Sequence, residues 1–135
     1  MGNTILLIDD SKMIQATFRE ALEEAGFMVI SAGDGQKGLE IAKAEKPDLI
    51  ILDVNMPVMN GWQFLRTLSI TPEIEDIPVL LATTREKIMD IEKGFALGIK
   101  DYVVKNEDLS QLVNKVEKVM AESRTEKGWV KKIFS

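Results

Sequence analysis

Two adjacent aspartates follow the first apolar run of this 135-residue chain. The run Ile5–Ile8 leads directly into Asp9 and Asp10. Neighbouring carboxylates repel each other, and removal from water raises the cost of their charge further. A hard divalent cation between Asp10 and Asp53, with Asp9 nearby, would offset this repulsion, because Mg²⁺ prefers a few carboxylates together with water and phosphate oxygens. The pattern therefore predicts a Mg²⁺ site, in which Mn²⁺ could substitute.

Three more reactive side chains each end an apolar run. Asp53 ends LIILD, Thr83 ends PVLLAT and Lys105 ends DYVVK. A carboxylate can act as a nucleophile, while a metal ion and a lysine can stabilise a phosphoryl group in transfer. Any one of these residues would more simply be a solvated turn residue. Because the whole set suits one reaction, we interpret it as a phosphoryl-transfer site.

These side chains would gather at one edge if the apolar runs are parallel strands of one sheet. Each run is almost wholly apolar, as is typical of strands buried on both faces, and amphipathic helical stretches separate the runs. This alternation predicts an α/β fold with a doubly wound, five-stranded parallel sheet, (β/α)5 and flavodoxin-like, whose carboxyl edge binds ligands. The predicted strands are Ile5–Ile8, Phe27–Ile30, Leu49–Leu52, Val79–Ala82 and Tyr102–Val104.

Helical spacing of apolar residues predicts five helices. The first follows Asp10 and is closed by Gly26; the second begins at the N-cap Asp34 and ends before Pro47. The third covers about 62–68. The last two are marked by Ile88, Ile91 and Phe95, closed by Gly98, and by Leu109, Leu112, Val113, Val116 and Met120.

The composition excludes several classes of function. The chain has no cysteine and no histidine, so it can form no disulfide, thiolate zinc site or Ser-His-Asp triad, and any metal must be bound by oxygen. The net charge of −5 argues against nucleic acid as a direct partner. No apolar run is long enough to span a membrane and the N-terminus lacks a secretory signal, so we expect a cytoplasmic protein.

We predict one domain over residues 1–121 and a tail over residues 122–135. The tail combines four basic and two acidic residues with four large apolar ones. We expect it to extend the last helix and then fray; alternatively, it docks a partner or an acidic surface, or packs on its own domain. It is too short for an effector domain, so the expected output is binding. The Met1 start favours a free-standing protein over a piece of a longer regulator.

In its ordered set of motifs the chain resembles a response-regulator receiver domain, the phospho-accepting module of two-component signalling. The resemblance covers nearly the whole chain. It rests on the aspartate pair, the pattern D-x-x-M-P-x-x-x-G from Asp53 to Gly61, Thr83, and Tyr102 with Lys105. It implies that a histidine kinase or histidine phosphotransfer protein phosphorylates Asp53 and that the product binds a downstream target protein.

The resemblance also implies a metal site. Mg²⁺ would be ligated by Asp10, by Asp53 and by the backbone carbonyl of Asn55, with Asp9 acting largely through metal-bound water.

A phosphorylation switch is implied as well. Thr83 would hydrogen-bond the phosphoryl group and Lys105 would pair with it. Tyr102 would turn inward as Thr83 moves, which would reshape the face formed by the fourth helix, fifth strand and fifth helix. Alternatively, Tyr102 is simply a half-buried strand aromatic, since β-strands favour tyrosine.

Four positions bear on the turn after the last strand or on the lifetime of the phosphorylated form. The family commonly has proline after the lysine, in a cis peptide; here Asn106 follows Lys105, and we expect a trans bond. Thr84 stands where a small residue is common and would narrow access to the phosphoacceptor. Asn55 and Arg85 would flank the approach of water, and Arg85 could shield phosphoryl oxygens.

Two rival interpretations share parts of the pattern. A flavodoxin-type cofactor binder has the same fold, but its phosphate loop needs hydroxyls and amides rather than Asp9 and Asp10. A haloacid-dehalogenase-type phosphatase also attacks from an aspartate, but it requires D-x-D where this chain has Asp53, Val54 and Asn55. A P-loop enzyme is excluded because its phosphate-binding motif is missing.

Overall fold

The computed structural model describes residues 3–56, 58–84, 91–105 and 108–134, with side chains up to Ser123. In these residues strands and helices alternate along the chain, as predicted. The elements are β1 Thr4–Ile8, α1 Lys12–Glu24, β2 Met28–Ala32, α2 Gly35–Glu45, β3 Leu49–Asp53, α3 Gly61–Ser69, β4 Val79–Thr83, α4 Ile91–Ala96, β5 Asp101–Val104 and α5 Leu109–Phe134.

The strands form one parallel sheet in the order β2-β1-β3-β4-β5, which confirms the predicted doubly wound fold. β1 and β3 are neighbours with Ile8 opposite Leu52, so the residues that follow both strands lie together. β4 and β5 are neighbours with Thr83 opposite Val104. The strand order reverses between β1 and β3, and ligands bind at this point of such sheets.

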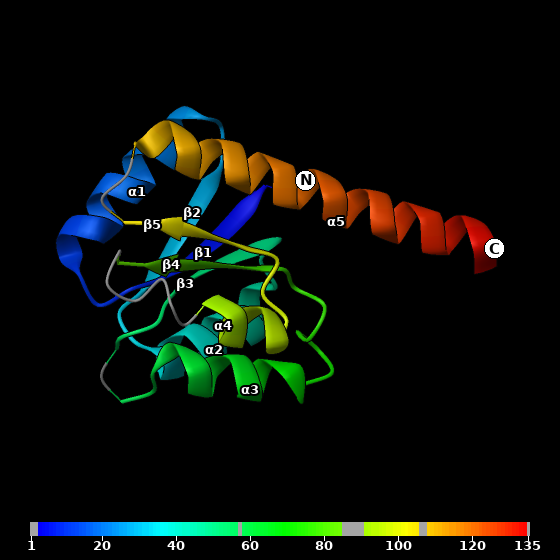
Figure 1. Cartoon of the computed structure of the whole chain (residues 1–135), viewed down its shortest axis with the longest axis horizontal. Helices are drawn as coiled ribbons and strands as arrows, with labels where there is room; N and C mark the ends of the chain where they lie inside the picture. Colours follow the sequence, from blue (N-terminus) through cyan, green and yellow to red (C-terminus); the bar gives the residue numbers. More distant parts are fainter. Residues whose placement is uncertain (1–2, 57, 85–90, 106–107, 135) are drawn as a thin grey trace.

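Helices cover both faces of the sheet: α1 and α5 lie on one face, and α2, α3 and α4 on the other (Figure 1). Alternate residues of β1 point to opposite faces of the sheet and pack against the helices on each face, as strand geometry requires. Ile5 and Leu7 pack with residues of α1 and α5, whereas Leu6 and Ile8 pack with residues of α2 and α3. All four side chains are fully buried, so β1 is held rigidly up to the acidic pair that follows it.

Local side chains set the helix starts. Ser11 caps α1 by accepting the Ile14 N–H, and Asp34 caps α2 by accepting the Lys37 N–H, which confirms the predicted N-cap. Asn60 caps α3 in a reciprocal pair of hydrogen bonds with Gln63. α3 therefore begins at Gly61, one residue before the predicted start.

The last two helices differ in detail from expectation. Phe95 of α4 is exposed, whereas the neighbouring Gly94 is buried close to Ile99, so the inner side of α4 runs through the glycine rather than the aromatic ring. Ile88 lies outside the described residues. α5 continues through Phe134 and projects past the sheet (Figure 1), while the boundary at residue 121 stays a prediction. No helix in the described ranges is long and apolar enough to cross a membrane.

Candidate functional site

Three carboxylates meet at the carboxyl edge of the sheet, at the junction of β1 and β3. Asp9 and Asp10 follow β1, and Asp53 is the last residue of β3. One oxygen of each lies within 4.8 Å of the others. Asp9 and Asp53 are buried, whereas Asp10 is exposed, so the cluster has two inner members and one at its mouth.

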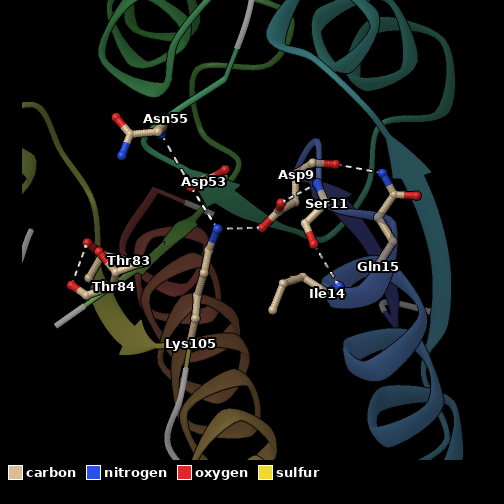
Figure 2. A network of polar contacts seen from close by, with 9 residues as sticks. All are labelled: Asp9, Ser11, Ile14, Gln15, Asp53, Asn55, Thr83, Thr84 and Lys105. Carbon is tan, nitrogen blue, oxygen red and sulfur yellow. Dashed lines mark hydrogen bonds and ion pairs between the residues drawn. The ribbon is translucent and has the colours of Figure 1, made fainter. Parts of the chain in front are cut away.

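Lys105 supplies positive charge to the buried pair. It follows β5, and its Nζ lies 2.8 Å from Oδ2 of Asp9 and 2.9 Å from Oδ1 of Asp53 (Figure 2). Only 11% of its side chain is exposed, so water screens these ion pairs weakly. The repulsion between the two inner carboxylates is thus offset by a residue of this chain.

Burial and charge shift the ionisation of the central residues. Burial raises the pKa of Asp53, and repulsion from Asp9 adds to this rise, while the hydrogen bond and charge of Lys105 and the Asn55 N–H oppose it. Burial lowers the pKa of Lys105, but the hydrogen bonds and charges of Asp9 and Asp53 outweigh burial and leave it above its ordinary value. Lys105 is therefore a firmly protonated cation beside a carboxylate that ionises at some cost.

The turn after β1 is held by a set of hydrogen bonds. The Asp9 N–H donates to the Ala32 carbonyl at 3.0 Å, which continues the β1–β2 pairing. The Ser11 N–H donates to Oδ1 of Asp9 at 2.9 Å. Nε2 of Gln15 donates to the Asp9 carbonyl at 2.6 Å. Sequence reasoning missed Gln15; its one signal was a polar residue near the start of a helix that follows two carboxylates.

The loop after β3 places Asn55 beside the phosphoacceptor candidate. The Asn55 N–H donates to Oδ1 of Asp53 at 3.3 Å, and the Asn55 side chain is exposed. Gly61 closes this loop: its N–H donates to the Val54 carbonyl, and a Cβ at Gly61 would lie 2.6 Å from the Asp53 carbonyl oxygen. The final glycine of the D-x-x-M-P-x-x-x-G pattern is thus explained by close approach of α3 to the end of β3.

Thr83 and Thr84 lie on the other side of Lys105 from Asp9 (Figure 2). Thr83 is buried at the end of β4, and its Oγ1 donates to the Thr84 carbonyl at 3.2 Å. Thr84 is half-buried. Arg85 and Asn106 lie outside the described residues, so the expectations for the Arg85 side chain and for the peptide before Asn106 stay predictions.

Tyr102 lies on β5 and is half-buried against the α2–α4 layer. Nζ of Lys115, from α5, lies 4.4 Å from the centre of the Tyr102 ring. The same Nζ donates to the Tyr102 carbonyl and lies 3.9 Å from Oδ1 of Asp101. Lys115 therefore holds the tyrosine from the α5 side.

The donor set suits a hard divalent cation. The three clustered side chains offer only carboxylate oxygens, and the exposed Asp10 gives an ion access from solvent. Mg²⁺ is usually bound by one or two carboxylates and retains several waters, so a half-open pocket of this kind fits it.

Comparison with known proteins identifies the family of the chain. The family described as the response regulator receiver domain matches residues 5–117. The chain is 35% identical over 117 residues to protein PilH of Pseudomonas aeruginosa, which covers 87% of this chain and 97% of PilH. It is 38% identical over 112 residues to the transcriptional regulatory protein HprR of Escherichia coli, covering 83% of this chain and 49% of HprR.

A solved structure has the same fold. The chemotaxis response regulator CheY4 of Vibrio cholerae superposes with a TM-score of 0.80 at 32% identity, over 86% of this chain and 97% of CheY4. This chain thus spans nearly all of PilH and CheY4 but about half of HprR.

Proposed function

The chain belongs to the response regulator receiver domain family, a phosphoacceptor module of two-component signal transduction rather than a classical enzyme, and we propose that Asp53 is its phosphoacceptor. The observation that carries the proposal is the environment of Asp53. Its carboxylate is buried at the β1/β3 switch point, 2.9 Å from Lys105 Nζ and grouped with Asp9 and Asp10.

The proposed reaction is a nucleophilic displacement at phosphorus. Within the described residues, both polar contacts of the Asp53 carboxylate, from Lys105 and from the Asn55 N–H, are made to Oδ1. Oδ2 is then the atom to attack. Its bond to phosphorus forms as the bond from phosphorus to the donor nitrogen or oxygen breaks, and the leaving group takes that electron pair. As negative charge passes from the carboxylate to the phosphoryl oxygens, the ammonium group of Lys105 can pair with those oxygens.

The reaction also needs a site for Mg²⁺, or for Mn²⁺ in its place. We propose Asp10, Asp53 and the backbone carbonyl of Asn55 as ligands. The Asp9 carboxylate already pairs with Lys105 and accepts the Ser11 N–H, which supports its contact with the metal through a bound water rather than directly. A bound divalent cation would neutralise charge on the transferring phosphoryl group.

The switch is proposed to run from Thr83 to Tyr102. The Thr83 hydroxyl now donates to the Thr84 carbonyl, so it must give up this bond to turn toward a phosphoryl group on Asp53. Tyr102 follows inward, and the surface of α4, β5 and α5 changes for a downstream target protein.

The remaining proposals concern partners and lifetime. The phosphodonor is a histidine kinase or a histidine phosphotransfer protein, and the working compartment is the cytoplasm. Thr84 is half-buried beside the switch hydroxyl, which supports a role in limiting access. Asn55, with Arg85, is proposed to limit attack by water.

A mass measurement with a small phosphodonor tests the proposal. Acetyl phosphate and Mg²⁺ should add one phosphoryl group to the wild type and none to Asp53→Asn. Asp48→Asn is the matched control, because Asp48 precedes the same strand at its opposite end and should leave labelling unchanged. Labelling of Asp53→Asn at the wild-type rate would refute the assignment.

A further inference from the structure

Asp10 is the one member of the acidic pocket whose side chain no described residue restrains. In the described part of the chain, the Asp9 carboxylate is held by Lys105 and the Ser11 N–H, and the Asp53 carboxylate by Lys105 and the Asn55 N–H. The exposed Asp10 carboxylate makes no hydrogen bond or ion pair with the described residues. The backbone therefore sets the point from which this side chain can reach the pocket.

The backbone of Asp10 is oriented by its neighbour on the amino side. The Asp9 carbonyl and the Asp10 N–H belong to one planar peptide unit, so whatever holds that carbonyl also holds the direction in which the Asp10 side chain leaves the turn. Gln15 holds it: its Nε2 donates to the Asp9 carbonyl at 2.6 Å, from the end of the first turn of α1 (Figure 2). The remaining bonds of the turn fix the Asp9 N–H and the Ser11 N–H.

The Gln15 bond opposes electrostatic repulsion within the acidic pocket. Three carboxylates offer oxygens within 4.8 Å of one another, and Lys105 contacts only two of them. Without a cation, the uncompensated Asp10 would lower its energy by rotating away from Asp53 into solvent. The side chain can also turn about its own torsions, but a rotation of the Asp10 backbone away from Asp53 would turn the Asp9–Asp10 peptide and break the Gln15 bond.

We propose that Gln15 is a positioning residue for the divalent cation site, which holds the Asp10 backbone so that the Asp10 carboxylate can face Asp53 when the ion arrives. The inference rests on the proposed function of the pocket. Gln15 itself does not touch the ion. It lowers the cost of binding because the ligand is already in place, as hydrogen bonds behind metal ligands commonly do.

The test is Mg²⁺ affinity of the unphosphorylated protein, measured by NMR titration of backbone amide shifts. Gln15→Met keeps the side-chain length and removes the donor; we expect a loss of about 10-fold in affinity, the lower end of the range for residues behind metal ligands. Gln63→Met is the matched control, since Gln63 also makes one side-chain bond to the backbone at a helix start, with the Asn60 N–H. It should bind Mg²⁺ within about twofold of wild type, although urea unfolding should show a similar stability loss for both variants.

A second variant separates positioning from charge. Gln15→Glu adds negative charge near the pocket, which by itself would strengthen Mg²⁺ binding, but its carboxylate cannot donate to the Asp9 carbonyl. Weaker binding than wild type supports positioning. Wild-type affinity in Gln15→Met, or tighter binding in Gln15→Glu, overturns it.

A third variant, Asp10→Asn, distinguishes failure of the role of Gln15 from failure of the proposed metal site. If Asp10→Asn loses affinity while Gln15→Met does not, the role of Gln15 is wrong and the metal site stands. If Asp10→Asn binds Mg²⁺ as the wild type does, the ion does not use Asp10, and both the metal site and the role of Gln15 are overturned.

Discussion

Gly61 offers the sharpest test of how the fold positions Asp53, through the change Gly61→Ala. A Cβ at this position would lie 2.6 Å from the Asp53 carbonyl oxygen and 2.9 Å from Cα of Val54, where ordinary contacts begin at 3.4 Å. Both atoms are backbone, and β3 is paired on both sides, so neither can turn aside. α3 must therefore move outward, which loosens the packing of its own Phe64 and Leu65 on the core.

The expected cost follows from these contacts. Overpacking of this kind costs about 1 to 3 kcal/mol, and the better helix propensity of alanine returns up to about 1 kcal/mol. We expect a net loss of about 2 kcal/mol in the free energy of unfolding, or about 7 °C in Tm for a domain of this size. Displacement of Asp53 should also slow labelling by acetyl phosphate at temperatures where the variant is folded.

Urea unfolding followed by far-ultraviolet circular dichroism, in EDTA, gives the measurement. The control is Gly38→Ala in α2, whose Cβ would meet the end of the Ile8 side chain, Cδ1 at 2.5 Å. That methyl group can rotate, so we expect less than half the loss. Equal losses in the two variants, or a Gly61→Ala protein as stable as wild type, would refute the reasoning from backbone contact.

Three other predictions concern the loop, the acidic pocket and the tyrosine. Val58 has φ 67° and is 82% exposed, a strained conformation for a β-branched residue, so Val58→Asn should raise stability by about 1 kcal/mol in thermal unfolding; a lower Tm would count against it. Burial, with repulsion from Asp9, raises the pKa of Asp53, so its ionised form lowers wild-type stability near neutral pH, and stability returns as pH falls through its folded-state pKa. In EDTA at pH 7, Asp53→Asn should thus be more stable than wild type by on the order of 1 kcal/mol, and the difference should shrink in acid; a difference that grows in acid would contradict this sign. Lys115→Met removes the cation over the ring of Tyr102, which is the one tyrosine of the chain. This change should lower the free energy of unfolding by about 1 kcal/mol and shift the single set of tyrosine ring NMR signals. Unchanged signals would show that the contact is not made in solution.

Much of the fold could be predicted from the sequence because the signals are local. Near-continuous apolar runs of strand length require burial on both faces, and helical spacing between them requires crossovers, so the parallel sheet follows. Asp34 was predicted as an N-cap from its type and position alone, since capping needs only a side-chain oxygen and the next turn of backbone. The gathering of Asp9, Asp53, Thr83 and Lys105 at one edge follows from parallel strand direction.

The partners within that edge required the tertiary structure. Lys105 reaches past the end of β4 to pair with two carboxylates, and no spacing along the chain encodes that distance. Burial likewise divides two neighbouring aspartates, leaving Asp9 inside and Asp10 at the surface. The bond from Gln15, the positive φ of Val58 and the exposure of Phe95 each depend on how an element is rotated or a loop closed against its neighbours. Hydrophobic patterning specifies which face of an element is buried, but the angle of its packing and the contacts of polar side chains are settled only when the layers come together.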